Sequence, residues 1–128
     1  MTYIEFRRQW LLHFAKGISD KDIKNYVVST GNHIWHIFSW GLLSKSCFLE
    51  GDTARKAFDN LSIYVKENAI YIEPFERGGS FSLTQKKVTS AMLDEHTEIF
   101  AVARDFSWTY IKTHEGNLCG PYFYRPKL

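Results

Sequence analysis

Apolar residues near the start of the chain recur at the spacing of one helix face. The recurring positions are Tyr3, Phe6, Trp10 and Phe14. Such a stripe is typical of an amphipathic helix packed on a core. Thr2 and Glu5 fit the Thr-x-x-Glu capping box that begins a helix, and Gly17 suits its end. Ser19 and Asp22 repeat a capping pattern, which predicts a short second helix directly after the first.

The middle of the chain changes from a strand pattern to a helix pattern. Residues 34–40 alternate with bulky side chains on both faces and are rich in aromatic and branched types, which predicts a strand buried on both sides. After the turn at Glu50 and Gly51, Asp52 is a good N-cap. The inward positions of the helix that follows are Ala54, Ala57, Phe58 and Leu61. This is the clearest helical stripe in the chain.

Strand patterns return in the second half. Residues 63–65 and 69–75 have strand character and are closed by Pro74 and the glycine-rich turn at 77–80. Thr84 can then cap a third amphipathic helix. The inward positions of that helix are Val88, Ala91 and Met92.

Residues 98–104 and 107–114 predict two strands joined by a tight turn. The second arm alternates between two faces. One face has Trp108, Tyr110, Lys112 and His114, and the other has Thr109, Ile111 and Thr113. Together the elements predict one α+β domain over residues 1–128: N-terminal helices, then a mainly antiparallel sheet of about four to five strands with helices packed on one face.

Composition and charge narrow the classes of function. A length of 128 residues with 45% apolar and 23% charged residues fits one ordinary globular domain. The net charge of +2 is spread without a basic stripe, which argues against a nucleic-acid partner. The longest uncharged stretch, residues 25–44, is too polar for a membrane span. Only Cys47 and Cys119 are present, so we expect no disulfide framework and a reducing, cytoplasmic location.

Two histidines in the middle of the chain raise the question of a metal site. His33 and His36 are three residues apart, so they would share a face of a helix, whereas a strand would send them to opposite faces. The predicted strand therefore counts against a shared ion. No group of Cys, His, Asp and Glu shows a recognised ligand spacing. We expect no metal and no cofactor, and His36 reads best as a histidine satisfied inside an aromatic core.

The most reactive combination lies at the end of the predicted last long strand. His114 and Glu115 precede a glycine-bearing loop, a plausible place for a general base with an adjacent carboxylate. Cys119 follows closely, and a thiolate paired with imidazole can be a nucleophile. His36 would complete such a site if it lay beside His114 across the sheet. The alternative for all four is a structural role, because sequence assigns no group to orient His114.

The aromatic content offers a different kind of site. The chain has 10 Phe, 7 Tyr and 4 Trp, which is many for the interior of so small a domain. Core filling accounts for most of them, but some must reach the surface, where aromatic residues act as interface anchors. The candidates for binding are Trp35, Trp108, Tyr110 and Tyr122.

Several phrases together indicate a family. They are WHIFS at 35–39, FLEG at 48–51, WTYIKTHE at 108–115 and CGPYF at 119–123. In this order and spacing the chain resembles small bacterial proteins, common in spore-forming Gram-positive genomes, that are classed as a domain of unknown function. The resemblance implies a cytoplasmic bacterial protein and no particular activity.

Small size, near-neutral charge and surplus aromatic residues therefore favour a non-enzymatic protein-binding module of the immunity or inhibitory type, whose partner is another protein. The alternative is a small hydrolase-like enzyme that uses His114 and Glu115 with His36. Sequence leaves the oligomeric state open.

Overall fold

The computed structural model describes residues 2–74 and 88–126. Within these ranges one sheet has the strand order β1-β5-β4-β3-β2, and every neighbouring pair is antiparallel. The strands are β1 (Phe48–Glu50), β2 (Ile70–Ile72), β3 (Ile99–Val102), β4 (Thr109–Lys112) and β5 (Tyr122–Tyr124). The predicted α+β class, with N-terminal helices and an antiparallel sheet, is confirmed.

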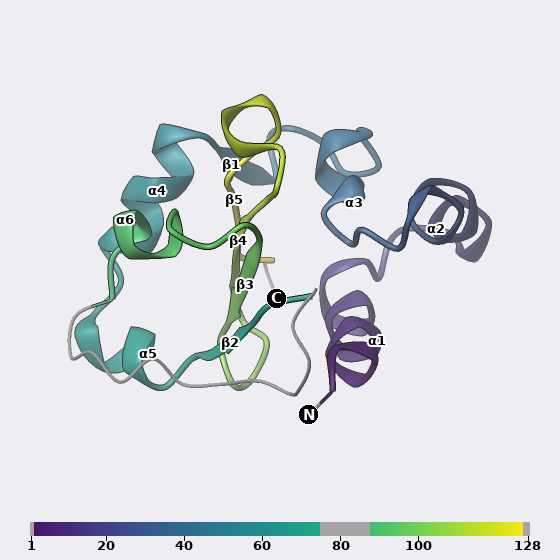
Figure 1. Ribbon diagram of the computed structural model, residues 1–128. Helices are drawn as coiled ribbons and strands as arrows, with labels where there is room; N and C mark the ends of the chain where they lie inside the picture. Colours follow the sequence, from purple (N-terminus) through teal and green to yellow (C-terminus); the bar gives the residue numbers. More distant parts are fainter. Residues whose placement is uncertain (1, 75–87, 127–128) are drawn as a thin grey trace.

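Helices lie on both sides of the sheet (Figure 1). One side has α1 (Tyr3–Phe14), α2 (Asp20–Tyr26) and α3 (His36–Ser39), and the other has α4 (Asp52–Asp59), α5 (Ile63–Glu67) and α6 (Ser90–Leu93). Two 3-10 turns, η1 (Val28–Thr30) and η2 (Gly116–Leu118), lie in the connections. The sequence predicted helices on one face. The second layer is present because the central strands are apolar on both faces, and each face needs a cover.

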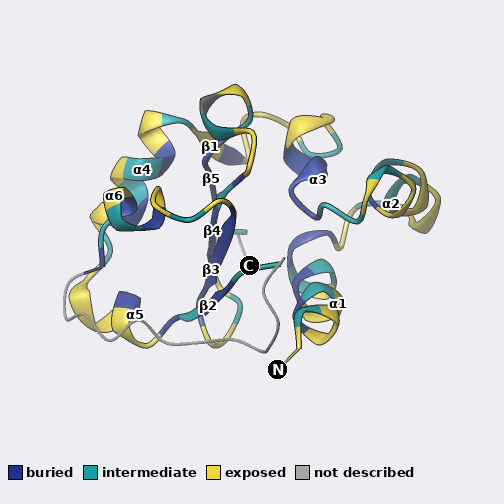
Figure 2. Cartoon of the chain, viewed as in Figure 1, coloured by how far each residue is buried: buried dark blue, intermediate teal, exposed yellow. Residues whose placement is uncertain are grey.

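Strand β4 separates two cores. Ile111 belongs to a cluster with Trp10 of α1 and Phe38 of α3, whereas Tyr110 belongs to a cluster with Phe58 of α4 and Leu93 of α6. Figure 2 shows the strands as buried elements between two layers of helices whose outer surfaces are exposed. The alternation predicted along residues 107–114 is thus confirmed for the described strand.

The first two helices begin as their sequences predict. Thr2 Oγ1 accepts a hydrogen bond from Glu5 N, and Thr2 N donates to the Glu5 carboxylate, so both halves of the capping box form. Ser19 Oγ accepts from Asp22 N at the start of α2. Trp10 is fully buried, and its Nε1 donates to Thr109 Oγ1 at 3.0 Å. This bond fixes α1 against the central strand.

The predicted strand at residues 34–40 is wrong. The chain makes tight turns here, with Trp40 N donating to His36 O at 2.9 Å, and forms the short helix α3. A short apolar run fits a buried strand and a buried helix equally well, because periodicity alone does not separate them. The error matters for the site, since it concerns the placement of His33 and His36.

The strand predicted at residues 63–65 is also wrong. Ser62 Oγ accepts from Val65 N and caps the helix α5. The strand predicted at 69–75 is confirmed in its central part as β2, and those at 98–104 and 107–114 are confirmed as β3 and β4 with shorter ends.

The other helix boundaries differ by small amounts. Helix α4 forms as predicted, with Gly51 rather than Asp52 at the N-cap position. In the described part of the third predicted helix, α6 begins at Ser90 and Thr89 Oγ1 caps it. Its buried residues are Ser90 and Leu93, and the inward position predicted for Ala91 is wrong, because Ala91 is exposed. Thr84 and the turn at 77–80 lie outside the described residues. Across 2–74 and 88–126, no helix combines the length and apolar character that crossing a membrane requires.

Candidate functional site

The end of the sheet brings together side chains that are distant in sequence. Glu98 directly precedes β3 and His114 follows β4. Because Ile99 is paired with Lys112, the two side chains leave neighbouring strands at the same end of the sheet. The segment that leads into α3 lies against this end (Figure 1), and it contributes His33, Trp35 and His36.

The carboxylate of Glu98 is the centre of the group. Its side chain is fully buried, and its Oε1 accepts from Trp35 Nε1 at 3.0 Å, from His114 N at 3.1 Å and from His114 Nδ1 at 2.8 Å. A buried carboxylate needs such donors, because burial without them is very costly. The other oxygen, Oε2, is buried and has no hydrogen-bond partner among the described residues.

A strained turn places His33. Gly31 and Asn32 have φ angles of 98° and 61°, which put two successive residues in the left-handed region, where only glycine is unstrained. The imidazole of His33 folds back over Gly31, where a Cβ would lie 3.1 Å from His33 Nε2. From this position the His33 ring lies 5.0 Å from the ring of His114, centre to centre.

His36 lies at the edge of the same group of rings. Its ring centre is 5.3 Å from that of His33 and 4.6 Å from that of Trp35. Its Nδ1 donates to Tyr26 O at 3.0 Å and lies 2.7 Å from Thr30 Oγ1. Burial lowers the pKa of His36, against the opposing effect of the Tyr26 carbonyl. Burial thus favours the neutral form of His36, which donates from Nδ1 to the Tyr26 carbonyl.

The site is open to solvent on the side of His114. That side chain is 33% exposed, and its Nε2 lies 3.7 Å from Glu115 Oε1 on the surface. On the inner side lies Tyr3 of α1. Burial and then the Glu98 carboxylate raise the pKa of its phenol. The group thus consists of a buried carboxylate and a histidine that is accessible to solvent.

Three of these residues present donor atoms to one another. One donor atom from each of His33, Glu98 and His114 can be chosen so that all lie within 4.8 Å of one another. Two imidazoles and a carboxylate can activate water in two ways. An imidazole oriented by the carboxylate can remove a proton from water, or the three side chains can hold a cation that lowers the pKa of a bound water.

The structure unites much of the site that the sequence suggested. Trp35, His36, His114 and Glu115 lie in the same region. The remaining catalytic candidate, Cys119, fits a nucleophile poorly, since burial, followed by Glu115 and Glu50, raises the pKa of its thiol. Cys119 and Cys47 are both free thiols.

The other aromatic candidates lie inside the molecule. Tyr110 and Tyr122 are buried, in different cores on the two sides of the sheet. Trp108 is also buried, although it lines a surface hollow beside α5. Of the residues predicted to bind through their rings, Trp35 alone joins the histidine cluster: its ring packs on those of His36 and His114, and its indole N–H donates to Glu98.

Sequence reasoning did not assign Glu98, and it set His33 aside. Glu98 is one acidic residue at the start of a strand, and no local pattern marks it. His33 was separated from its neighbours by the wrong strand prediction. The hairpin of β3 and β4 was the available signal, because it brings residue 98 beside the end of residues 107–114.

The fold and the site define a small three-layered α+β domain with a histidine–glutamate cluster at one end of its sheet. The chain belongs to the DUF4275 family, a domain of unknown function, whose family model matches residues 2–123. Searches of curated proteins and of solved structures found no match.

Proposed function

We propose that this protein is a small hydrolase-like enzyme that activates water at His33, Glu98 and His114. The observation that supports it is the carboxylate of Glu98, which is buried, held by Trp35 Nε1 and His114 N, and in contact with the half-exposed imidazole of His114. A fold does not bury a carboxylate beside an accessible histidine without cost. Such arrangements are common where proton transfer occurs.

Each neighbouring residue has a part in this proposal. Glu98 orients the His114 ring, and the exposed edge of His114 faces the water and the substrate. His114 Nε2 can accept the proton that leaves the water, and Glu115, whose Oε1 lies 3.7 Å from that nitrogen, can stabilise the imidazolium that forms. His36 and Trp35 touch no substrate; they position His33 and Glu98.

The test is hydrolysis of chromogenic esters. The purified protein is assayed with p-nitrophenyl acetate, p-nitrophenyl phosphate and bis(p-nitrophenyl) phosphate, with and without added divalent cations. We expect turnover of at least one substrate, and a fall in kcat/KM of about 100-fold or more in Glu98→Gln and in His114→Asn, the usual size of an acid–base contribution.

Two variants serve as matched controls. His13→Asn changes a histidine that stacks on Phe106 of the hairpin turn instead of joining the cluster, and Glu67→Gln changes an exposed carboxylate at the end of α5. Both should keep wild-type turnover. The proposal fails if folded wild-type protein hydrolyses none of the three esters, or if Glu98→Gln retains full activity.

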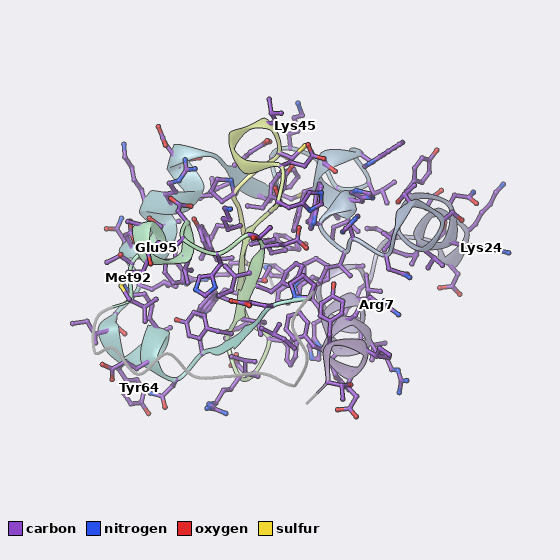
Figure 3. The ribbon with its side chains drawn as sticks, in the orientation of Figure 1. Arg7, Lys24, Lys45, Tyr64, Met92 and Glu95 are labelled. Atoms are coloured by element: carbon purple, nitrogen blue, oxygen red, sulfur yellow. The ribbon has the colours of Figure 1, made fainter. Side chains whose placement is uncertain are left out.

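A second candidate function, binding of another protein in an immunity or inhibitory role, has support from α5. Ile63 is half exposed and Tyr64 is 75% exposed, and Figure 3 shows Tyr64 pointing away from the body of the molecule. Beside them is a hollow of about 470 Å³, which is lined in part by Trp108 and Arg104. Exposed aromatic residues next to a hollow are typical of interface anchors.

A pull-down from host lysate at physiological salt tests this second candidate. One stoichiometric protein that binds wild type and Leu118→Ala, but not Tyr64→Ala, would support it, because Leu118 is equally exposed but on η2. Capture that is unaffected by Tyr64→Ala would contradict it. Under either function we propose a cytoplasmic bacterial protein, to which two free thiols are suited.

A further inference from the structure

The unpartnered oxygen of Glu98 requires an explanation of its own. Trp35 Nε1, His114 N and His114 Nδ1 all donate to Oε1, while Oε2 is buried and has no hydrogen-bond partner in the described part of the chain. Buried polar atoms are nearly always satisfied, and an exception calls for a physical reason such as an ion. When all the donors bind one oxygen of a carboxylate, the other oxygen is left to bind a ligand. This is the arrangement of Glu98, whose Oε1 has three donors and whose Oε2 has none among the described residues.

The histidines beside Glu98 are suitable ligands. His33, Glu98 and His114 each offer a donor atom within 4.8 Å of the other two. Donor atoms about 2.1 Å from a tetrahedral ion are separated by roughly 3.4 Å. The three donor atoms must therefore move closer together to bind an ion, and small changes of side-chain rotamer can bring them together. Two imidazoles with one carboxylate form the three-ligand set of catalytic zinc sites, which leave a fourth position for water.

The surroundings supply the outer shell that such a site needs. Metal-binding carboxylates are held by further hydrogen bonds, and here the Trp35 indole and the His114 backbone hold Glu98. The absence of a side chain at Gly31 leaves room for the His33 ring. The half-exposed side chain of His114 provides the route by which an ion enters.

We propose that His33, Glu98 and His114 bind one divalent transition-metal ion, with Zn²⁺ as the best match, through one ring nitrogen of each histidine and Glu98 Oε2. This inference departs from the sequence, which predicted no metal. It rests on the proposed function only for its catalytic consequence: the bound ion lowers the pKa of its water and takes the place of an imidazole base.

The test measures binding separately from activity. Protein stripped with EDTA and dialysed is titrated with ZnCl₂ by calorimetry, and metal content is measured by mass spectrometry. We expect one Zn²⁺ per chain with a dissociation constant of about 1 μM or tighter. Glu98→Gln, which keeps the shape of the side chain and an acceptor for Trp35, should weaken binding by about 100-fold or more. Loss of an outer-shell partner alone costs about 10–100-fold.

Controls exclude binding elsewhere and loss of the fold. His13→Asn and the Cys47→Ser/Cys119→Ser pair should keep one-site binding, because neither alters the three ligands. Near-UV circular dichroism, which reports the packing of the buried Trp35, should be unchanged in Glu98→Gln. Co²⁺ in place of Zn²⁺ should give the intense visible absorption of a four-coordinate ion in wild type and lose it in His114→Asn.

The outcomes separate this inference from the proposed function. One-site binding that depends on Glu98 supports the metal site even if no ester is hydrolysed. Hydrolysis that persists in EDTA-treated protein and depends on Glu98 leaves the hydrolase standing and overturns only the catalytic consequence of the ion. Absence of binding in wild type, or binding that Glu98→Gln leaves unchanged, overturns the metal site.

Discussion

The indole Nε1 of Trp35 donates a 3.0 Å hydrogen bond to Oε1 of Glu98, across 63 residues of sequence. This bond connects the entrance of α3 to the end of the sheet. It holds the carboxylate on which both the proposed water-activating role and the proposed cation site depend. Trp35 is thus a positioning residue, and its removal should affect the stability of the protein and the affinity of the site together.

Trp35→Phe should destabilise the protein more than Trp10→Phe. Both indoles are buried, and each donates one bond of 3.0 Å, but Trp35 donates to a carboxylate and Trp10 to the hydroxyl of Thr109. Hydrogen bonds to charged groups contribute about 1.5–3 kcal/mol, against about 0.5–1.5 kcal/mol for neutral pairs. Urea unfolding of both variants, with EDTA present, measures the difference. Equal losses of unfolding free energy in the two variants would mean that the Trp35 indole does not bond to a charged carboxylate.

Much of the fold was predictable because its signals are local. The capping box of Thr2 and Glu5 involves neighbouring residues, and the alternation along β4 depends on the two faces of one strand. The short helix α3 was not predictable in this way. Residues 34–38 are all buried, so within this run no exposed position reveals the helical period.

The site was predictable only in part, because some of its residues are marked by a local pattern and others only by contacts between distant segments. His114 and Glu115 follow a recognisable strand, so they were found. Glu98 has no distinguishing neighbour in sequence, and its importance comes from the β3–β4 pairing and from the Trp35 indole. His33 depends on the left-handed turn at Gly31 and Asn32, which the wrong strand prediction concealed.

Gly31→Ala should weaken zinc binding, whereas Gly41→Ala should not. Both glycines have positive φ, 98° and 71°, so both substitutions should cost about 1 kcal/mol or more of stability. Only the Cβ at Gly31 would press on the His33 ring, at 3.1 Å, while the one at Gly41 would meet nothing within 4 Å. Calorimetric titration with ZnCl₂ distinguishes them. Equal affinities in the two variants would show that His33 is not a ligand.

Asp59→Ala should destabilise the protein far more than Asp52→Ala. The two oxygens of Asp59 accept from Ser90 N at 2.7 Å and from Ser90 Oγ at 2.8 Å, which ties the end of α4 to the start of α6. Loss of both leaves a half-buried amide unpaired, at a cost of about 1.5–3 kcal/mol. Asp52 is 87% exposed and pairs with Arg55 on the surface, where ion pairs contribute about 1 kcal/mol or less. Thermal unfolding of both variants tests this, and similar melting temperatures would contradict it.

Tyr110→Phe should be neutral or slightly stabilising, while Tyr71→Phe should be destabilising. Both tyrosines are fully buried. Tyr71 Oη donates to Lys66 O at 2.6 Å, but Tyr110 Oη has no hydrogen-bond partner within the described residues. Removing a satisfied hydroxyl costs about 1 kcal/mol, whereas removing an unsatisfied one relieves a desolvation penalty. Chemical denaturation measures the free energy of unfolding of both variants. A loss of unfolding free energy above about 1 kcal/mol in Tyr110→Phe would reveal a partner for the Tyr110 hydroxyl.

The most direct test of the account is the location of a metal ion in crystals of zinc-loaded protein, from anomalous scattering measured on both sides of the zinc absorption edge. We expect one strong peak about 2.0–2.2 Å from donor atoms of His33, Glu98 and His114, and no such peak in Glu98→Gln. A map with no density between these three side chains, and zinc bound instead at a surface group such as the exposed thiol of Cys47, would contradict it.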